Sequence, residues 1–526
     1  MRTLAALLAA SASFLLLAAN NEPVALEITL VGSATGRATP GVMRLLDAEG
    51  KAVPIPGTLS RGEGLDQNSA IGQWNVVVAP VRVELPRGVY QIEAFSGTET
   101  ELAHLEVDLQ SGATKSVSVP LARFSRVADA GWRSANTHLH LMKLDRETAD
   151  RYLTEVPAAD DLDVLFVSYL ERVDDDKEYV TNRYAIGDLK QFSLGRVLVN
   201  NGEEHRHNMS GYGEGYGHVM LLDIRELVQP VSIGPGIMKS GHDGTPLQPG
   251  IENAHDQGGR AVWCHNDWGM EDIPNWLTGR LDAQNIFDGG HHGSFKDSFY
   301  RYLNVGLRVP FSTGTDWFMY DLSRVYAAAN GALTPRAWLE ALAAGRSFIS
   351  NGPLLEFSVE GHGIGETLEL SAPRAVRVEG VARGRGDFGR IELVRNGDVV
   401  LAANTEAVDG HFEARLDGMV DLAGPGWLAL RTPPPPTPDE NDRQETHPRN
   451  ELGGHLFGHT SPVYVTVAGR SVFDFAEAER LLADMRSAQQ AITEHGQFPD
   501  DASKARVLGV YDEAIATLGR RMNENR

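Results

Sequence analysis

The fold of this 526-residue chain is decided by the stretch Val197-Leu198-Val199-Asn200-Asn201-Gly202-Glu203-Glu204-His205-Arg206-His207. An apolar run leads there directly into carboxylates and imidazoles. Similar short apolar runs, spaced by helix-length segments, occur at 164–167, 219–222, 261–263 and 309–311. Such runs are typical of buried parallel strands, which are apolar on both faces. Candidate ligands follow the runs at Glu203, His265 and Asp316, on the side where β/α barrels and open α/β sheets build their sites. Residues 125–353 are therefore predicted to form a distorted β/α barrel.

Alternating apolar and polar residues mark the regions that flank this barrel. Short runs broken by turn residues extend over residues 23–124 and 354–472, which is typical of antiparallel sheets. Apolar residues at helical spacing from 473 to 526, with a break at Gly496 to Pro499, predict two helices. The sequence thus predicts an α/β protein in which the barrel is flanked by two β-sandwich-like domains and followed by a C-terminal helical pair.

One helix inside the barrel region is marked by its end signals. Thr334 is typical of an N-cap, Pro335 suits the first helical position, and Gly345 marks the end.

Composition limits the class of function. The net charge of -23 argues against a nucleic-acid partner, because phosphates require a basic surface. The single cysteine, Cys264, cannot form an internal disulfide. Residues 1–19 contain one charge and a long apolar run, which suits a signal peptide, with an uncleaved anchor as the alternative. We therefore expect a periplasmic or secreted protein without a later transmembrane segment, acting on a small-molecule or surface-polymer substrate.

Histidines are concentrated in the barrel region. Ten of the seventeen lie between His138 and His292, in less than a third of the chain. Histidine gathers in this way for metal, proton or phosphate chemistry.

His138 and His140 are the first candidate ligands. In an extended chain, residues two apart point to the same face, so both imidazoles can share a metal. A pair of surface histidines is the alternative. Glu203 and Glu204 add carboxylates after a strand, and their adjacency leaves open which one binds. The alternative for that segment, including His205, is a solvated charged turn.

Three further candidates lie next to apolar runs. His218 enters a strand, and His265 follows one, with a hydrogen-bonded core histidine as its alternative. Strand alternation places Cys264 on the face opposite His265, so we expect a buried, inert thiol there. Asp316 could bind metal or accept a proton, or it could cap a following helix.

Two glycine-flanked motifs carry weaker signals. The loop 211–217 precedes a strand rather than a helix, which disfavours a phosphate-binding loop. His291 and His292 are expected in a loop that touches substrate or has no role.

Taken in order, these motifs resemble those of a known superfamily. The relevant residues are the run Gly131 to His140, the Gly-x-Glu at Gly202 to Glu204, Gly217-His218, His265, Asp316, and the run Arg346 to Pro353. The chain resembles the PHP (polymerase and histidinol phosphatase) superfamily, and within it the carbaryl-hydrolase-like CehA/McbA metallohydrolases.

The resemblance implies a distorted β/α barrel that binds divalent cations, commonly zinc or manganese, and hydrolyses ester, carbamate or phosphoester bonds. It implies that the metal ligands are His138, His140, Glu204, His218, His265 and Asp316. Members often carry Thr-Asp-His where this chain has Ser168-Tyr169-Leu170, and a histidine where it has Phe318. These departures favour one or two ions over three.

The expected function is that of an exported hydrolase that uses a metal-bound hydroxide on an ester, carbamate or amide bond. Asp316 or Glu204 would take the proton, and Arg206 or His207 would stabilise the developing negative charge. One alternative is a phosphoesterase of the PHP type. Another is a non-catalytic protein that binds polysaccharide or a cell surface and retains a relic barrel.

Overall fold

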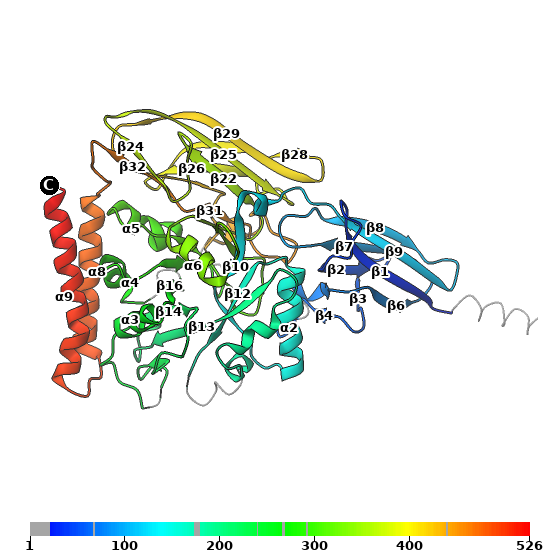
Figure 1. Ribbon diagram of the computed structural model, residues 1–526, viewed down its shortest axis with the longest axis horizontal. Helices are drawn as coiled ribbons and strands as arrows, with labels where there is room; N and C mark the ends of the chain where they lie inside the picture. The colour runs from blue at the N-terminus through cyan, green and yellow to red at the C-terminus, as the bar shows by residue number, and fades with distance from the viewer. Residues whose placement is uncertain are drawn as a thin grey trace, which may run out of the picture.

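The computed structural model describes residues 22–66, 69–172, 179–238, 240–265, 269–290, 293–437 and 440–526. Figure 1 shows a β-rich region at the N-terminal end, a large sheet with helices in the middle, and two long helices at the opposite end. The predicted signal peptide, residues 1–19, lies outside the described residues. Within the described ranges, every helix is too short or too polar to cross a bilayer.

The N-terminal module, residues 24–121, consists of two small sheets. The three-stranded sheet has the order β6-β1-β9, and the six-stranded sheet has the order β4-β5-β2-β7-β8 with β3 beside β2. Leu26, Met43, Ile92 and Val119 show that both sheets contribute to one core. The strands are β1 (Val24–Gly32), β2 (Gly41–Leu46), β3 (Ala52–Val53), β4 (Leu59–Ser60), β5 (Asn75–Val77), β6 (Val81–Leu85), β7 (Val89–Phe95), β8 (Ala103–Asp108) and β9 (Thr114–Leu121).

A sixteen-stranded sheet forms the centre of the molecule. Its order is β18-β17-β16-β14-β13-β12-β10-β20-β21-β31-β30-β26-β27, while β15 pairs with β13, β32 with β30, and β24 with β32. The strands from the middle of the chain are β10 (Trp132–Asn136), β12 (Val164–Tyr169), β13 (Leu198–His207), β14 (Gly217–Leu222), β15 (Ser232–Ile233), β16 (Arg260–Cys264), β17 (Ala283–Asn285), β18 (Phe311–Ser312), β20 (Arg324–Ala328) and β21 (Ser347–Ser350). Beside this sheet, β11 (Leu139–His140) pairs in parallel with β19 (Asp316–Trp317).

The predicted β/α barrel is wrong, and the region after residue 354 does not form a separate sandwich. Strands β10, β12 and β13 are parallel, but β14 is antiparallel to both β13 and β16, and β20 is antiparallel to β10. The sheet also continues through β21 and β31 into the region after residue 354, which the sequence had assigned to a separate domain. An apolar run reports that a strand is buried on both faces, but it carries no information on the direction of its neighbours or on closure of the sheet.

The region after residue 354 contributes to two sheets. Strands β22, β23, β25, β28 and β29 form a five-stranded sheet in the order β23-β22-β25-β29-β28, and the others extend the central sheet. The strands are β22 (Leu354–Val359), β23 (His362–Gly363), β24 (Thr367–Leu370), β25 (Arg374–Gly384), β26 (Arg390–Arg395), β27 (Asp398–Asn404), β28 (Glu406–Val408), β29 (His411–Leu422), β30 (Gly426–Arg431), β31 (Gly458–Thr460) and β32 (Val463–Val467).

The α-helices of the described residues lie between residues 146 and 524. Helix α6 begins where the sequence predicts, because Thr334 caps it by accepting a hydrogen bond from the Ala337 amide. The α-helices are α2 (Arg146–Ala159), α3 (Gln248–Asp256), α4 (Asp272–Leu277), α5 (Arg301–Asn304), α6 (Pro335–Ala343), α7 (Asn441–Gln444), α8 (Phe475–His495) and α9 (Asp501–Glu524). The short helices are η1 (Ile71–Gln73), η2 (Val127–Ala130), η4 (Val180–Arg183), η5 (Asp188–Phe192) and the π-helical η6 (Lys296–Tyr300).

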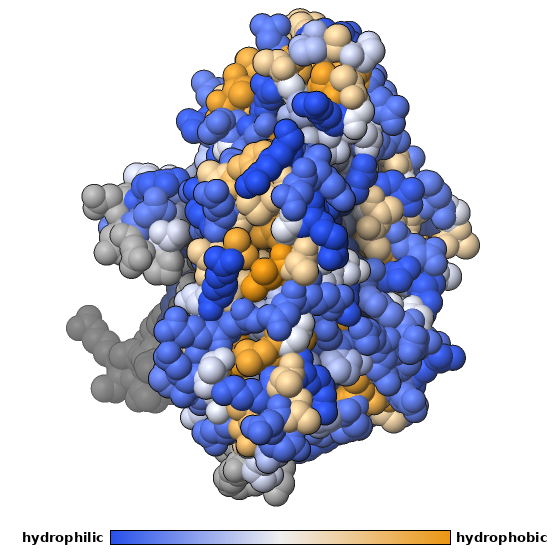
Figure 2. All heavy atoms as spheres, turned by 90° about the vertical axis from the view of Figure 1, so that its left-hand side faces the viewer, coloured by the Kyte–Doolittle hydropathy of each residue, from blue (hydrophilic) through white to orange (hydrophobic). Residues whose placement is uncertain are grey.

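The C-terminal helices α8 and α9 lie side by side where the sequence predicts a helical pair (Figure 1). Leu481 and Met485 of α8 and Val510 and Tyr511 of α9 join the core that surrounds β14 and β16. Figure 2 shows the side of the molecule on which these helices lie, with mostly hydrophilic residues and small apolar areas between them. The pair therefore closes one side of the central core.

Candidate metal centre

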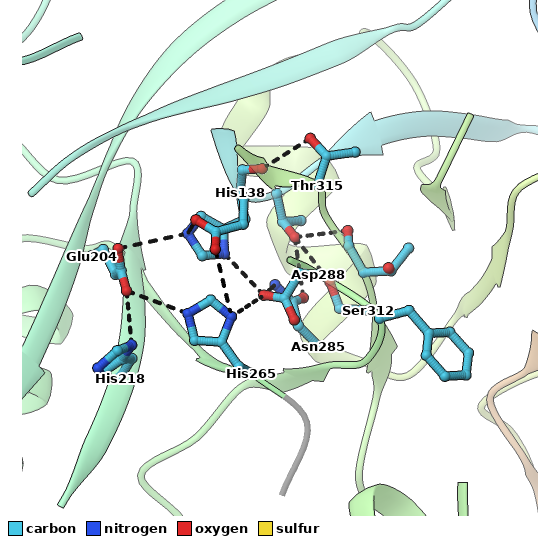
Figure 3. Close-up of polar contacts among 12 residues, drawn as sticks. His138, Glu204, His218, His265, Asn285, Asp288, Ser312 and Thr315 are labelled. Carbon is cyan, nitrogen blue, oxygen red and sulfur yellow. Dashed lines mark hydrogen bonds and ion pairs between the residues drawn. The ribbon is translucent and has the colours of Figure 1, made fainter. Parts of the chain in front are cut away.

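Seven buried side chains from different elements converge beside the central sheet. Figure 3 shows His138, Glu204, His218, His265 and Asp288 gathered around one point. Strands β11, β13, β14 and β19 carry four of the seven residues, and the others lie within three residues of the ends of β10, β16 and β17. None is more than 8% exposed: His138, His140, Glu204, His218, His265, Asp288 and Asp316.

His138 and His140 face each other as the His-x-His spacing predicts. Their Nε2 atoms lie 3.0 Å apart. Nδ1 of His140 donates to the Ser168 carbonyl oxygen at 2.9 Å, and Nδ1 of His138 lies 2.9 Å from Asp288 Oδ2. Because both Nδ1 atoms are occupied as donors, the neutral rings present their Nε2 lone pairs to the same space.

Glu204 lies between two groups of histidines. Its Oε2 is 2.9 Å from His140 Nε2 and 3.9 Å from His138 Nε2. Its Oε1 is 2.9 Å from His218 Nδ1 and 3.4 Å from His265 Nε2. One carboxylate thus has an oxygen on each group, which is the arrangement of a bridging ligand.

The neighbouring Glu203 points to the other face of β13. Its carboxylate lies 3.0 Å from His205 Nδ1 and accepts a hydrogen bond from the Val228 amide at 2.7 Å. The sequence left open which of the two glutamates binds metal. Strand alternation decides it, because it turns Glu204 toward the centre.

Asp316 approaches from β19. Its Oδ1 lies 3.2 Å from His138 Nε2 and 3.7 Å from His140 Nε2. The Asp316 amide donates to the His138 carbonyl at 2.9 Å, so the backbone ties this residue to the first pair of histidines. Asp316 has a φ of +61°, a strained value for a non-glycine residue that is typical of functional positions. It lies in a short strand and not at a helix start, so it is not an N-cap.

Asp288 is a member of the cluster that the sequence did not predict. Besides its contact with His138, it accepts a hydrogen bond from Asn285 Nδ2 at 3.1 Å and lies 3.7 Å from His265 Nδ1. The sequence pattern at Asp288 is the same as at His265: a potential ligand shortly after a strand. It was hidden because β17 contains the polar residues Gln284 and Asn285 and does not read as an apolar run.

The charges in the cluster are strongly coupled. Burial lowers the pKa of His138, but Asp316, Asp288 and Glu204 outweigh it and raise that pKa to about 10. The pKa of His265 is likewise raised to about 9, by Asp288, Glu204 and Asp316 against burial. Burial raises the pKa of Glu204, yet Arg206 and the surrounding histidines hold it well below the usual range. The Glu204 carboxylate therefore stays charged and attracts a positive charge to the centre.

The residues present fit a divalent cation. Ligating atoms lie within 4.8 Å of one another in three groups: His138, His140, Glu204 and Asp316; Glu204, His218 and His265; and His138, Cys264, His265 and Asp288. Among the described residues, Asp288 Oδ1 is buried without a hydrogen-bond partner, and His218 Nδ1 and Asp316 Oδ1 have only ion-pair contacts, the first with Glu204 and the second with His138 and His140. Buried polar atoms without partners are costly, and a cation would satisfy them. These buried groups could hold a metal ion.

Cys264 lies closer to the cluster than predicted. Its sulfur belongs to one of the groups whose ligating atoms are within 4.8 Å of one another, together with His265. The prediction that these two residues face opposite sides was wrong, because His265 lies just beyond the last residue of β16, where strand alternation no longer applies. Burial, followed by the charges of Asp288, Glu204 and Asp316, raises the pKa of the thiol well above its usual value.

Arg206 and His207 lie on opposite faces of β13. The Arg206 guanidinium is 3.4 Å from Glu204 Oε2. His207 instead pairs with Asp243 Oδ1 at 3.0 Å and stacks on Tyr216 with ring centroids 3.9 Å apart. Of the two residues expected to stabilise negative charge, only Arg206 adjoins the cluster.

The departures from the PHP pattern have structural roles. The Ser168 carbonyl orients His140, and the Phe318 ring packs against Tyr152. His291 and His292 lie outside the described residues.

No family model, curated protein or solved structure matches this chain.

Proposed function

We propose that this protein is an exported metal-dependent hydrolase that cleaves an ester, carbamate or amide bond at a centre of two ions. The position of Glu204 between two groups of histidines is the observation that carries the proposal. The order of motifs that resembles the PHP metallohydrolases supports it from the sequence side, although the likeness rests on motifs and not on a barrel. Export rests on the apolar N-terminal pattern alone.

The ligands divide into two sets that share one carboxylate. His138, His140 and Asp316 would hold the first ion with Glu204 Oε2, and His218 and His265 would hold the second with Glu204 Oε1. Imidazole and carboxylate ligands suit zinc and manganese. When bound, such ions lower the pKa of water toward neutrality and polarise the bond to be cleaved.

Asp316 is the residue best placed to accept the proton of the attacking water. Its Oδ1 is buried, and its nearest imidazole contact, with His138 Nε2 at 3.2 Å, does not have the geometry of a hydrogen bond. Glu204 is less suited, because both of its oxygens are engaged by imidazoles. Arg206 lies against Glu204, where it balances the carboxylate charge. Asp288 and Ser168 orient His138 and His140 by fixing which ring nitrogen carries the proton.

A comparison of the two adjacent glutamates tests the proposal. Glu204→Gln should abolish binding of at least one ion and turnover of aryl esters, carbamates or amides. Glu203→Gln, the matched control, changes the same chemistry on the opposite face of β13 and should keep the metal content. Elemental analysis of the purified wild-type protein measures the ions directly.

Assays with esters and with phosphates distinguish the proposal from the two alternative functions. Turnover of aryl phosphates without turnover of esters would replace the proposal with a phosphoesterase. A wild-type protein that contains no metal and turns over neither class would overturn it in favour of a non-catalytic binding protein.

A further inference from the structure

We infer that Arg61 of the N-terminal module is a positioning residue of the metal centre, because it holds the loop that carries Asp316. This inference rests on the proposed function of the centre, and it gives the N-terminal module a role in metal binding. We use the word loop for residues 316–322, which start with the two residues of β19, paired with β11, and continue toward strand β20.

Arg61 reaches this loop through a completely buried guanidinium group. Its Nε and one terminal nitrogen donate to the two carboxylate oxygens of Asp160, at 3.0 and 2.6 Å. Its remaining hydrogen bonds go to the loop backbone, to the carbonyl of Met319 and, at 3.3 Å, to that of Asp321. The guanidinium makes all four of these hydrogen bonds, whereas a lysine ammonium has only three donors and cannot replace them all.

The module makes a second contact with the same loop at Gly64. A Cβ at this position would lie 2.2 Å from the Phe318 ring, so only glycine allows the ring to pack there. The Phe318 amide in turn donates to the His140 carbonyl at 3.0 Å. The N-terminal module therefore contacts a residue that is hydrogen-bonded to a ligand of the centre.

The loop needs this support because its backbone is strained. Both Asp316 and Phe318 have positive φ values, +61° and +54°. Such conformations persist only where the surroundings determine them. On one side the loop is fixed by the carbonyls of His138 and His140, and on the other by Arg61 and Gly64.

A purely structural interface would act differently. Arg123 pairs with Asp161 Oδ2 at 2.7 Å and with Glu99 Oε2 at 3.3 Å. Arg123 follows β9, and Asp161 lies in the turn after α2. Both ion-pair partners of Arg123, Asp161 and Glu99, lie outside the loop. Arg123 is therefore a matched control for Arg61.

The test compares metal binding by Arg61→Lys and Arg123→Lys in the full-length protein, by titration of the metal-free protein with zinc. Arg61→Lys should weaken the ion bound by Asp316 by about 10–100-fold, as for other residues that orient ligands. Arg123→Lys should leave this affinity within a few-fold of wild type, even if its melting temperature falls as much as that of Arg61→Lys. Equal losses in both variants would overturn the inference.

A double-mutant cycle shows whether Arg61 acts through Asp316. In an Asp316→Asn background, Arg61→Lys should cause no further loss of affinity, because the ligand it positions is already impaired. Full additivity of the two losses would contradict the inference. If the wild-type protein binds neither zinc nor manganese, the proposed function itself fails; if it binds either ion and the cycle is additive, only the role of Arg61 fails.

Should Arg61→Lys fail to fold, Gly64→Ala disturbs the same loop without touching the buried charge. Its control is Gly57→Ala, because Gly57 has a similar φ, +83° against +80°, and a Cβ there meets nothing within 4 Å. Zinc affinity should fall in Gly64→Ala and not in Gly57→Ala. The same affinity in both would overturn the inference.

Discussion

The Nε2 atoms of His138 and His140 lie 3.0 Å apart, and the Nδ1 atom of each ring faces an oxygen of Asp288 or Ser168. Two nitrogen lone pairs cannot share this space without a positive charge between them. In the metal-free protein a proton supplies it, because Asp316, Asp288 and Glu204 outweigh the effect of burial and raise the pKa of His138 to about 10. A metal ion would replace that proton, so metal binding and protonation should compete.

Removal of divalent metal should lower the stability of the protein. A ligand that binds only the folded state at 100 times its dissociation constant stabilises it by about 2.7 kcal/mol. The melting temperature should therefore fall after chelation and recover when zinc or manganese is added, as measured by calorimetry. His140→Ala should lose most of this metal-dependent rise. A wild-type melting temperature that changes neither on chelation nor on addition of metal would contradict the prediction.

Asp288→Asn should weaken metal binding by about 10–100-fold, because it removes the carboxylate that orients His138. The matched control is Asp282→Asn, since Asp282 Oδ2 also lies 2.9 Å from an imidazole nitrogen, that of His255, in a partly exposed pair. The control should keep its metal affinity. Isothermal titration of both metal-free variants checks the difference, and equal affinities would show that Asp288 does not act on the centre.

Stability should also depend on pH through Glu271, a buried residue beside α4. Burial, opposed by hydrogen bonds from the Leu247 amide and Asn275, raises the pKa of its carboxyl from 4.5 to about 8. Between these values the folded state binds more protons than the unfolded state, so the free energy of unfolding falls as pH rises. The loss is about 1.4 kcal/mol per unit of pKa difference and is complete above the folded pKa.

Glu271→Gln should remove this dependence. The amide is neutral at every pH and can still accept from the Leu247 amide, so the variant should be more stable than wild type at pH 8 and show a flatter profile between pH 4.5 and 8. Urea unfolding across this range measures the slope. Glu226→Gln, at an exposed position, should leave the profile unchanged. If the unfolding free energy of Glu271→Gln depended on pH as steeply as that of wild type, Glu271 would not be the cause of this dependence.

Most of the candidate site could be predicted from local sequence, because its residues lie in strands or shortly after them. His138, His140, Glu204, His218, His265 and Asp316 all lie in the cluster that the structure brings together. Their types and their places beside apolar runs marked them as candidates, and the resemblance to the PHP superfamily selected Glu204 over Glu203. Asp288 could not be found in this way because its strand is short and polar.

The arrangement of the sheet was not accessible from the same signals. The run at Val219 to Leu222 is as apolar as that at Val164 to Val167, yet β14 is antiparallel to its neighbours whereas β12 is parallel to β10 and β13. Direction depends on which distant strand pairs with which, and that is decided by packing of the whole chain. The support of Asp316 by Arg61 is invisible for the same reason, because the two residues are remote in sequence.

Arg206 and His207 should respond differently to substitution, although they are adjacent. Arg206 lies 3.4 Å from Glu204, so Arg206→Met removes a positive charge that lowers the Glu204 pKa. The acid limb of kcat/KM should then move to higher pH, because the loss of the Arg206 charge raises the pKa of Glu204. His207→Gln can still contact Asp243 on the opposite face of β13 and should leave the limb in place. Hydrolysis rates of both variants across the acid range measure the two shifts. An equal displacement in His207→Gln would mean that His207 acts on the centre despite its orientation, and that the face of β13 does not decide which residue influences Glu204.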